Sequence, residues 1–381
     1  PDDQVGEALV LMQRHGVHRV VVQDDGKILG LLESLDLFGF LSNHSMLIDR
    51  RLRAATDLDA LARAAGQMND MIRRQYRGGT RVELLARLVQ DLNGRLFEQA
   101  WQLIAPPELV QNSCLLVMGS EGRGEQLLKT DQDNALLLRD GYVPPDDLPA
   151  ICARFSEALA RFGYPPCPGD VMLSNATWRG TVQDFARRVR KWLVLPEADS
   201  LINLAVFMDA HAVCGDAELL ASLRRQVFGM LADDDAMMSR FVAVVDAFGD
   251  GTRWWRRMLG GGEANLNVKK AGMFPLVHGV RSMALAERID ATSTEARIRA
   301  LQEAGALDAE TAQELTESLH FFMGLRLKAG LDEMDRGQPV SGKVDLAGLT
   351  PLERDLLKDA LAAVRRFRAQ LRLRFRLGAV S

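Results

Sequence analysis

Residues 115–126 of this chain read LLVMGSEGRGEQ, and residues 130–138 read TDQDNALLL. The first apolar run stops at a glycine turn, which predicts a short buried strand that ends near Met118. Gly119 and Ser120 are small enough to let backbone N–H groups approach phosphate oxygens, and the later glycines permit a tight anion-binding turn. This string therefore predicts a phosphate-binding loop between a strand and the start of a helix.

Two carboxylates stand at the entry to the second predicted strand. Asp131 and Asp133 are two residues apart, and an extended backbone places alternate side chains on the same face. Oxygen ligands of this kind suit Mg²⁺, which bridges one or two protein carboxylates to substrate phosphates. We therefore expect Asp131 and Asp133 to be catalytic residues that hold Mg²⁺, or Mn²⁺, for in-line phosphoryl transfer.

Other interpretations of the glycine-rich string compete with this one. Gly119, Gly122 and Gly124 do not give the G-x-G-x-x-G order of a dinucleotide-binding turn. Lys129 and Thr130 have no preceding glycine, which a P-loop requires. A solvated strand entry with an Asx turn, or an inactive descendant of an enzyme, would leave the two aspartates without a catalytic role.

The order of these motifs resembles the nucleotidyltransferase fold of the DNA polymerase beta superfamily, in which a strand ends in Gly-Ser and an Asp-x-Asp pair enters the next strand. The fuller string resembles, more narrowly, the bacterial DUF294 family of nucleotidyltransferases, relatives of the PII-protein uridylyltransferases. This resemblance implies that Gly119 and Ser120 hold the triphosphate of an NTP. It also implies that Arg123 and Glu125 brace the loop or contact the phosphates.

The superfamily usually supplies a third metal-binding carboxylate from a later part of the chain, and two residues are candidates. Asp170 lies on an expected strand that would run beside the first two strands. Asp209 follows an apolar run that looks helical, and it resembles the position of a glutamate in the uridylyltransferases. A surface or capping role suits either carboxylate as well, so the sequence leaves the third ligand open.

The final third of the chain is predicted to be helical, and its segment NLNVKKAGMFPLVHGVR at residues 265–281 resembles the substrate-binding domain of DUF294 proteins. His278 and Arg281 are three residues apart and so share a face of the expected helix. Together with Lys269 and Lys270, they are expected to form a basic wall opposite the two aspartates that binds the nucleotide. A helix cap with solvated lysines is the alternative.

The N-terminal segment has the pattern of a helix followed by a hairpin. An Asp-Gly turn separates two apolar runs within residues 17–32, which is a hairpin signal. The pattern resembles the latter part of a CBS domain, a module that senses adenine nucleotides in pairs. Asp36 matches the ribose-contacting aspartate of that family, whereas Glu33 and Leu35 depart from its pattern. CBS modules tend to associate, which makes a homodimer one expected assembly.

The composition argues against some classes of binding partner and indicates where in the cell the protein is expected. The chain has 381 residues, with 47 basic and 51 acidic side chains and a formal net charge of −4, so no nucleic-acid or anionic-membrane partner is expected. The 4 cysteines form no C-x-x-C pair, which argues for reduced, cytoplasmic thiols. No apolar run approaches the ~20 residues that span a bilayer. Because the chain begins at Pro1 rather than at methionine, we expect that upstream sequence was removed.

We therefore predict an α+β protein with a polymerase-beta-like α/β nucleotidyltransferase core. The expected units are a partial CBS domain, a helical connector, the nucleotidyltransferase-like domain and an all-α substrate-binding domain, at residues 1–46, 47–105, 106–234 and 235–381. The predicted reaction moves a nucleoside monophosphate from an NTP to a hydroxyl of a protein, as in uridylyltransferases, or of a small molecule. The alternative is a non-catalytic signalling module that only binds nucleotide.

Overall fold

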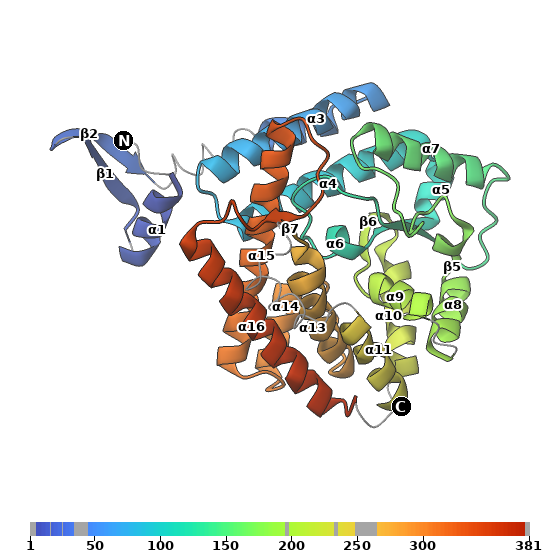
Figure 1. Cartoon of the computed structure of the whole chain (residues 1–381). Helices are drawn as coiled ribbons and strands as arrows, with labels where there is room; N and C mark the ends of the chain where they lie inside the picture. The colour runs from blue at the N-terminus through green and yellow to red at the C-terminus, as the bar shows by residue number, and fades with distance from the viewer. Residues whose placement is uncertain are drawn as a thin grey trace.

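The computed structural model covers the 381-residue chain. It describes residues 5–15, 17–24, 26–33, 45–194, 198–231, 235–247 and 265–377. Figure 1 shows a small N-terminal unit, an α/β core and a group of C-terminal helices. The predicted fold class is confirmed, because a small mixed sheet lies within a largely helical chain and a helical region follows it. No helix among these residues combines the length and the apolar character needed to cross a membrane.

The core is built on a four-stranded sheet with the strand order β5-β4-β3-β6. β3 (Ser113–Val117) pairs antiparallel with both β4 (Asn134–Leu138) and β6 (His211–Gly215). β4 pairs parallel with the short β5 (Arg179–Thr181). Every residue of β3 and β4 is buried, as expected for apolar strands that are covered on both faces.

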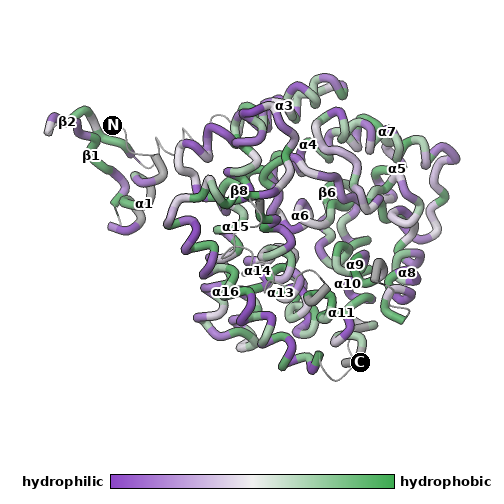
Figure 2. The backbone as a smooth tube through the Cα atoms, viewed as in Figure 1, coloured by the Kyte–Doolittle hydropathy of each residue, from purple (hydrophilic) through white to green (hydrophobic). Residues whose placement is uncertain are grey.

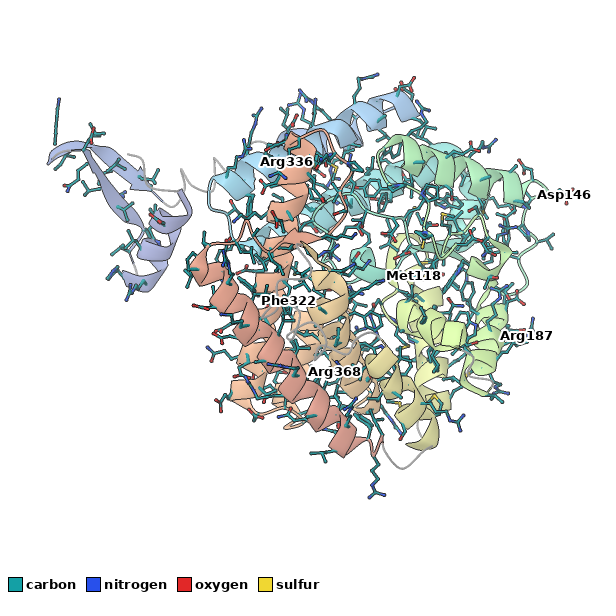
Figure 3. The ribbon with its side chains drawn as sticks, viewed as in Figure 1. Met118, Asp146, Arg187, Phe322, Arg336 and Arg368 are labelled. Atoms are coloured by element: carbon teal, nitrogen blue, oxygen red, sulfur yellow. The ribbon has the colours of Figure 1, made fainter. Side chains whose placement is uncertain are left out.

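The register of β3 and β4 brings the two sequence motifs together. Val117, the last residue of β3, pairs with Asn134, the first residue of β4. The backbone N–H of Met118 then donates to the carbonyl of Asp133 at 2.9 Å. Met118, labelled in Figure 3, is fully buried. The Gly-Ser turn and the two aspartates therefore meet at one end of the same strand pair.

Helices cover this sheet and brace it. They are α3 (Leu58–Arg77), α4 (Val82–Ile104), α5 (Pro107–Gln111), α7 (Leu148–Arg161), α8 (Val182–Val194), α9 (Ala198–Phe207) and α10 (Ala217–Leu231). α10 packs on β3, β4 and β6, while α4 packs on β6 and α7. Trp101 of α4 meets Phe155 of α7 edge to face, with ring centroids 5.4 Å apart. The loop that carries Asp131 is thus held between a sheet end and packed helices.

The C-terminal helices form a bundle around one buried helix. They are α11 (Asp235–Ala247), α13 (Phe274–Ala286), α14 (Thr294–Glu303), α15 (Ala309–Asp335) and α16 (Pro351–Arg374). α13 packs against α11, α14 and α16, and all of its residues from Pro275 to Leu285 are buried. Phe322 of α15, labelled in Figure 3, lies fully buried in this bundle. A helix buried on all sides is part of a core, and its polar residues need partners inside the protein.

The N-terminal unit contains α1 (Val5–His15) and a hairpin of β1 (Arg19–Asp24) and β2 (Lys27–Glu33). The predicted hairpin is confirmed, and Gly26 at its turn has a φ of 81°. Figure 2 shows hydrophobic residues along both strands. Val21, Ile28 and Leu31 are exposed, so the described part of the chain does not cover them. Leu35 and Asp36 lie outside the described residues.

Candidate active site

The turn after β3 requires glycine at its first position. α6 (Gly119–Gly122) is a single helical turn, and Gly119 has a φ of 56°, in the left-handed region. A Cβ at Gly119 would lie only 2.3 Å from Oδ2 of Asp133. A Cβ at Gly122 would lie 2.1 Å from the backbone oxygen of Asp209. Glycine therefore allows the Asp133 carboxylate to rest directly against the turn.

Gly119→Ala is expected to weaken Mn²⁺ binding by about tenfold, because the new Cβ displaces the Asp133 carboxylate. The left-handed backbone costs alanine a further ~1–2 kcal/mol of stability. Titration calorimetry with Mn²⁺ measures this change. Gly305→Ala is the matched control, since Gly305 has a φ of 70° with nothing within 4 Å of its Cβ position. It should lose stability but keep its Mn²⁺ affinity. Wild-type affinity in Gly119→Ala would show that Asp133 does not bind the cation.

A buried polar chain ties the turn to the helices behind it. The Glu121 carboxylate accepts from Nδ2 of Asn93 at 2.9 Å, and the Tyr164 hydroxyl donates to Oδ1 of Asn93 at 2.5 Å. Burial raises the pKa of Glu121 to about 8. Ser120 remains partly exposed, and its Oγ donates to Oε1 of Gln126 at 2.9 Å. Glu121 therefore anchors the turn, while Ser120 stays at its surface.

The segment that carries the two aspartates is anchored by the residues between and beside them. Nε2 of the buried Gln132 donates to the carbonyls of Ser156 and Tyr164, at 3.1 and 3.2 Å. Oδ1 of Asn134 accepts from the backbone N–H of Leu173 at 2.9 Å. Because Gln132 and Asn134 point into the core, the alternate side chains of Asp131 and Asp133 point to the other face. The expected common face of the two aspartates is what the structure shows.

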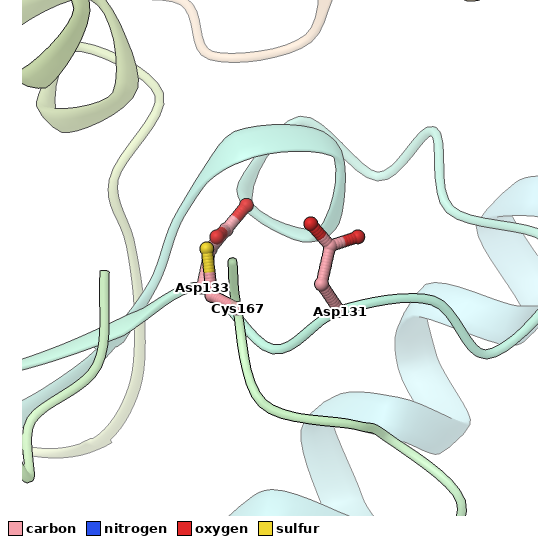
Figure 4. A group of neighbouring side chains, drawn as sticks. All are labelled: Asp131, Asp133 and Cys167. Atoms are coloured by element: carbon pink, nitrogen blue, oxygen red, sulfur yellow. The ribbon is translucent and has the colours of Figure 1, made fainter. Parts of the chain in front are cut away.

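Cys167 completes a group of three side chains that could hold a metal ion. The ligand atoms of Asp131, Asp133 and Cys167 all lie within 4.8 Å of one another. Figure 4 shows these three side chains as neighbours. Burial raises the pKa of Asp133 to about 6, and the charge of Asp131 adds to this effect, whereas a hydrogen bond from Cys167 opposes it. Burial, followed by the charge of Asp133, raises the pKa of the Cys167 thiol to about 11. The two crowded carboxylates suit a divalent cation that prefers oxygen ligands, such as Mg²⁺ or Mn²⁺, and such a cation would offset their mutual repulsion. The thiol of Cys167 is a softer ligand, which these two ions do not prefer.

Neither candidate for the third carboxylate belongs to this group. The strand predicted around Asp170 is wrong, because residues 171–175 form turns and Asp170 itself has a φ of 54°. The exposed Asp170 carboxylate accepts from Nδ2 of Asn175 at 2.8 Å. Asp209 is fully buried and follows the end of α9. The position beside Asp131 and Asp133 is taken by Cys167 instead.

Asp209 is the centre of a buried ion cluster that joins the core to the C-terminal helices. Its Oδ1 accepts from Arg281 at 2.9 Å and from Arg297 at 2.7 Å, while Oδ2 accepts from Arg123 and Arg281, both at 2.5 Å. Burial alone would raise the pKa of Asp209, but the three guanidinium charges hold it well below its usual range. Both carboxylate oxygens are thus committed to arginine.

The neighbours of Asp209 serve the same junction. Nε of Arg123 donates to Oε2 of Glu125 at 2.6 Å, and Oε1 of Glu125 accepts from the backbone N–H of Thr294 at 3.0 Å. The buried His278 donates from Nε2 to the carbonyl of Phe241 at 2.7 Å, and its Nδ1 accepts from Arg281 at 3.1 Å. Burial, with the adjacent charge of Arg281, lowers the pKa of His278 to about 3.

The residues expected to form a basic wall therefore occupy different places. His278 and Arg281 are buried in the junction, where their partners are Phe241 and Asp209 rather than Asp131 or Asp133. Lys269 and Lys270 are exposed at the start of the π-helix η2 (Lys269–Met273). The positive charge of Lys269 partly opposes the rise in the pKa of Asp133, so Lys269 lies near enough to act on the Asp133 carboxylate.

Lys129 takes no part in the candidate site, although it stands next to Thr130. Its Nζ donates to the carbonyls of Ala65 and Phe162, at 2.6 and 2.7 Å.

Sequence reasoning did not single out Cys167, which stands in a proline-rich loop without a second cysteine at metal-binding spacing. It also missed Arg326 of α15, which lines a cavity beside Ser120 and Thr130. Both residues come from segments that are distant in sequence and reach the site only through tertiary packing. No local sequence pattern therefore marks them as site residues.

A strand that ends in Gly-Ser, a single helical turn and a carboxylate pair at the entry of the neighbouring strand define a nucleotidyltransferase-like core. Residues 66–199 match the family model described as "Putative nucleotidyltransferase DUF294". Residues 235–375 match "Putative nucleotidyltransferase substrate binding domain", and residues 1–43 match the CBS domain. The chain therefore carries a DUF294 nucleotidyltransferase segment, a DUF294 substrate-binding segment and a CBS segment, as the sequence motifs predicted. Among curated proteins, none matches the chain.

Proposed function

We propose that this protein transfers a nucleoside monophosphate from an NTP to a hydroxyl group, with release of pyrophosphate. The observation that carries the proposal is the meeting of the Gly119 turn with Asp131 and Asp133 at one end of β3 and β4. A phosphate-binding turn beside paired carboxylates is the arrangement that metal-assisted phosphoryl transfer needs. The family matches support nucleotidyl transfer in general.

The proposed roles follow from the position of each residue. Asp131 and Asp133 would hold Mg²⁺ or Mn²⁺, and the Cys167 thiol stands beside them. The bound cation would neutralise phosphate charge during in-line displacement. The turn at Gly119 and the partly exposed Ser120 would hold the triphosphate, and Lys269 would add positive charge nearby. Arg123 and Glu125 would act indirectly, since they brace the turn against α14.

The acceptor and the N-terminal unit complete the proposal. A protein hydroxyl is the preferred acceptor because the motifs resemble those of uridylyltransferases, and a small-molecule hydroxyl is the second choice. The CBS segment would regulate the reaction, as a homodimer or with a second CBS unit, because such modules bind adenine nucleotides in pairs. We place the protein in the cytoplasm on the basis of its unpaired cysteines.

A non-catalytic nucleotide-binding module is the second candidate function. It is favoured by the donor set, in which a thiol rather than a third carboxylate stands beside Asp131 and Asp133. A missing carboxylate removes a group that would help to deprotonate the attacking hydroxyl. In this case the C-terminal helices would report nucleotide binding to a partner through the Asp209 cluster.

Label transfer separates the two candidates. The full chain is incubated with Mg²⁺ or Mn²⁺, with each of the four α-labelled NTPs in turn, and with a bacterial lysate as the source of acceptors. We expect one NTP to label a protein or small-molecule acceptor and to release pyrophosphate. Nucleotide binding without any label transfer would contradict the enzyme proposal and support the signalling module.

A further inference from the structure

Helix α15 of the C-terminal bundle is seated on the loop that links the Gly-Ser turn to Asp131. A Cβ at Gly330 would lie 2.4 Å from Cδ1 of Leu128, so the helix approaches this loop as closely as glycine permits. Arg326 stands one helical turn before Gly330, and residues four apart share a face of a helix. Arg326 is therefore directed toward the same loop.

A small cavity separates Arg326 from the turn. Its volume is about 30 Å³, and its lining includes Ser120, Glu125, Gln126, Thr130, Met323 and Arg326. A cavity needs about 10–15 Å³ to hold one water, so this cavity holds about two water-sized groups, such as the terminal oxygens of a phosphate. The cavity brings a guanidinium and two hydroxyls together at the side of the turn that faces α15.

The guanidinium of Arg326 has no counter-ion among the described residues. Its one hydrogen bond there runs from Nη1 to Sδ of Met273 at 3.5 Å, and its buried Nε has no hydrogen-bond partner. Burial and the charge of Arg123 lower the pKa of Arg326, while Asp131 and Glu125 exert weaker opposing effects. By contrast, Arg123 binds two carboxylates directly. A buried guanidinium that keeps a free hydrogen-bond donor is expected to bind an anion.

We propose that Arg326 binds the β- and γ-phosphates of the NTP, the part that leaves as pyrophosphate. This inference rests on the proposed function of the same site. The planar fork of arginine matches two phosphate oxygens, and Nε is one arm of that fork. Ser120 and Thr130 line the same cavity, and the Thr130 hydroxyl can donate to the same group. The C-terminal helices thereby supply a phosphate ligand that the core lacks.

The test measures binding of inorganic pyrophosphate, in the presence of Mg²⁺, to the full chain by titration calorimetry. Arg326→Gln should weaken binding by at least about tenfold, and Arg326→Lys, which keeps the charge but loses the fork, by less. Arg366→Gln is the matched control, because the exposed Arg366 pairs with Glu314 at 2.7 Å on the surface of the bundle. This control removes the same charge and should stay within about twofold of wild type.

Three results would overturn the inference: no pyrophosphate binding by wild type, unchanged affinity in Arg326→Gln, or an equal loss in Arg366→Gln. If Arg326→Gln does not fold, Arg326→Lys decides, and wild-type affinity in that variant counts against the phosphate contact. Arg326-dependent pyrophosphate binding without nucleotidyl transfer would leave the subsite standing while the proposed reaction fails. Transfer with an unchanged KM for NTP in Arg326→Gln would reject the subsite alone.

Discussion

Asp133→Asn should lower the rate of nucleotidyl transfer by at least about a hundredfold, and Asp131→Asn should have a similar effect. Each change keeps the shape of the side chain but removes a carboxylate charge from the group that includes Cys167. The measurement is the initial rate of label incorporation at saturating NTP and metal. The loss should not come from unfolding. Since burial raises the pKa of Asp133 to about 6, ionisation at neutral pH opposes folding, and the neutral amide should retain or increase thermal stability.

Asp146→Asn provides the matched control for both variants. Asp146 lies in an exposed loop at the edge of the core, as Figure 3 shows, and the substitution removes the same charge. Its rate should stay within about twofold of wild type. If Asp133→Asn and Asp131→Asn transferred label as fast as Asp146→Asn, the reaction would have to occur elsewhere in the protein.

The part of this site that the sequence predicted is the part that local geometry determines. The Gly119 turn and the Asp131–Asp133 pair belong to two strands that are close in sequence and paired in space. Strand periodicity is enough to place both carboxylates on one face. The same holds for the N-terminal hairpin, where the Asp-Gly turn and two apolar runs specify the pairing.

The rest of the site depends on how distant segments pack, which sequence spacing does not reveal. Helical periodicity places His278 and Arg281 on one face, but it does not say whether that face meets a ligand or the protein interior. The packing of α13 against α11 and α14 decides this, and it turns both residues toward Phe241 and Asp209. Cys167 likewise approaches Asp133 because its loop folds back beside β4.

The Asp209 cluster gives the arginine and the glutamate of the glycine-rich turn a structural role. Arg123 binds Asp209 and Glu125, and Glu125 in turn binds the backbone at the start of α14. The turn that would hold the triphosphate is therefore attached directly to the C-terminal helices. A change in their packing would move Gly119 and Ser120, which gives either proposed function a route between the bundle and the nucleotide.

Asp209→Asn should lower the free energy of unfolding by about 3–5 kcal/mol, because the change leaves three buried guanidinium groups around a neutral amide. Chemical denaturation at pH 7 measures the loss. Asp355→Asn is the control, since Asp355 pairs with Lys358 on the surface, where such pairs contribute about 1 kcal/mol or less. Equal stability of the two variants would mean that the cluster does not hold the domains together.

The pH dependence of the wild-type protein gives an independent check on the same cluster. The arginines hold the pKa of Asp209 below its usual range, so the folded protein binds a proton at Asp209 more weakly than the unfolded chain does. The stabilising contribution of Asp209 should therefore be fully present above the unfolded pKa of about 4 and should decline as the pH falls below it. In Asp209→Asn this component disappears, so the difference in unfolding free energy between wild type and variant should be constant near neutral pH and should shrink in acid. A difference that stays constant down to pH values well below about 4 would show that Asp209 is not held in its charged form by the arginines.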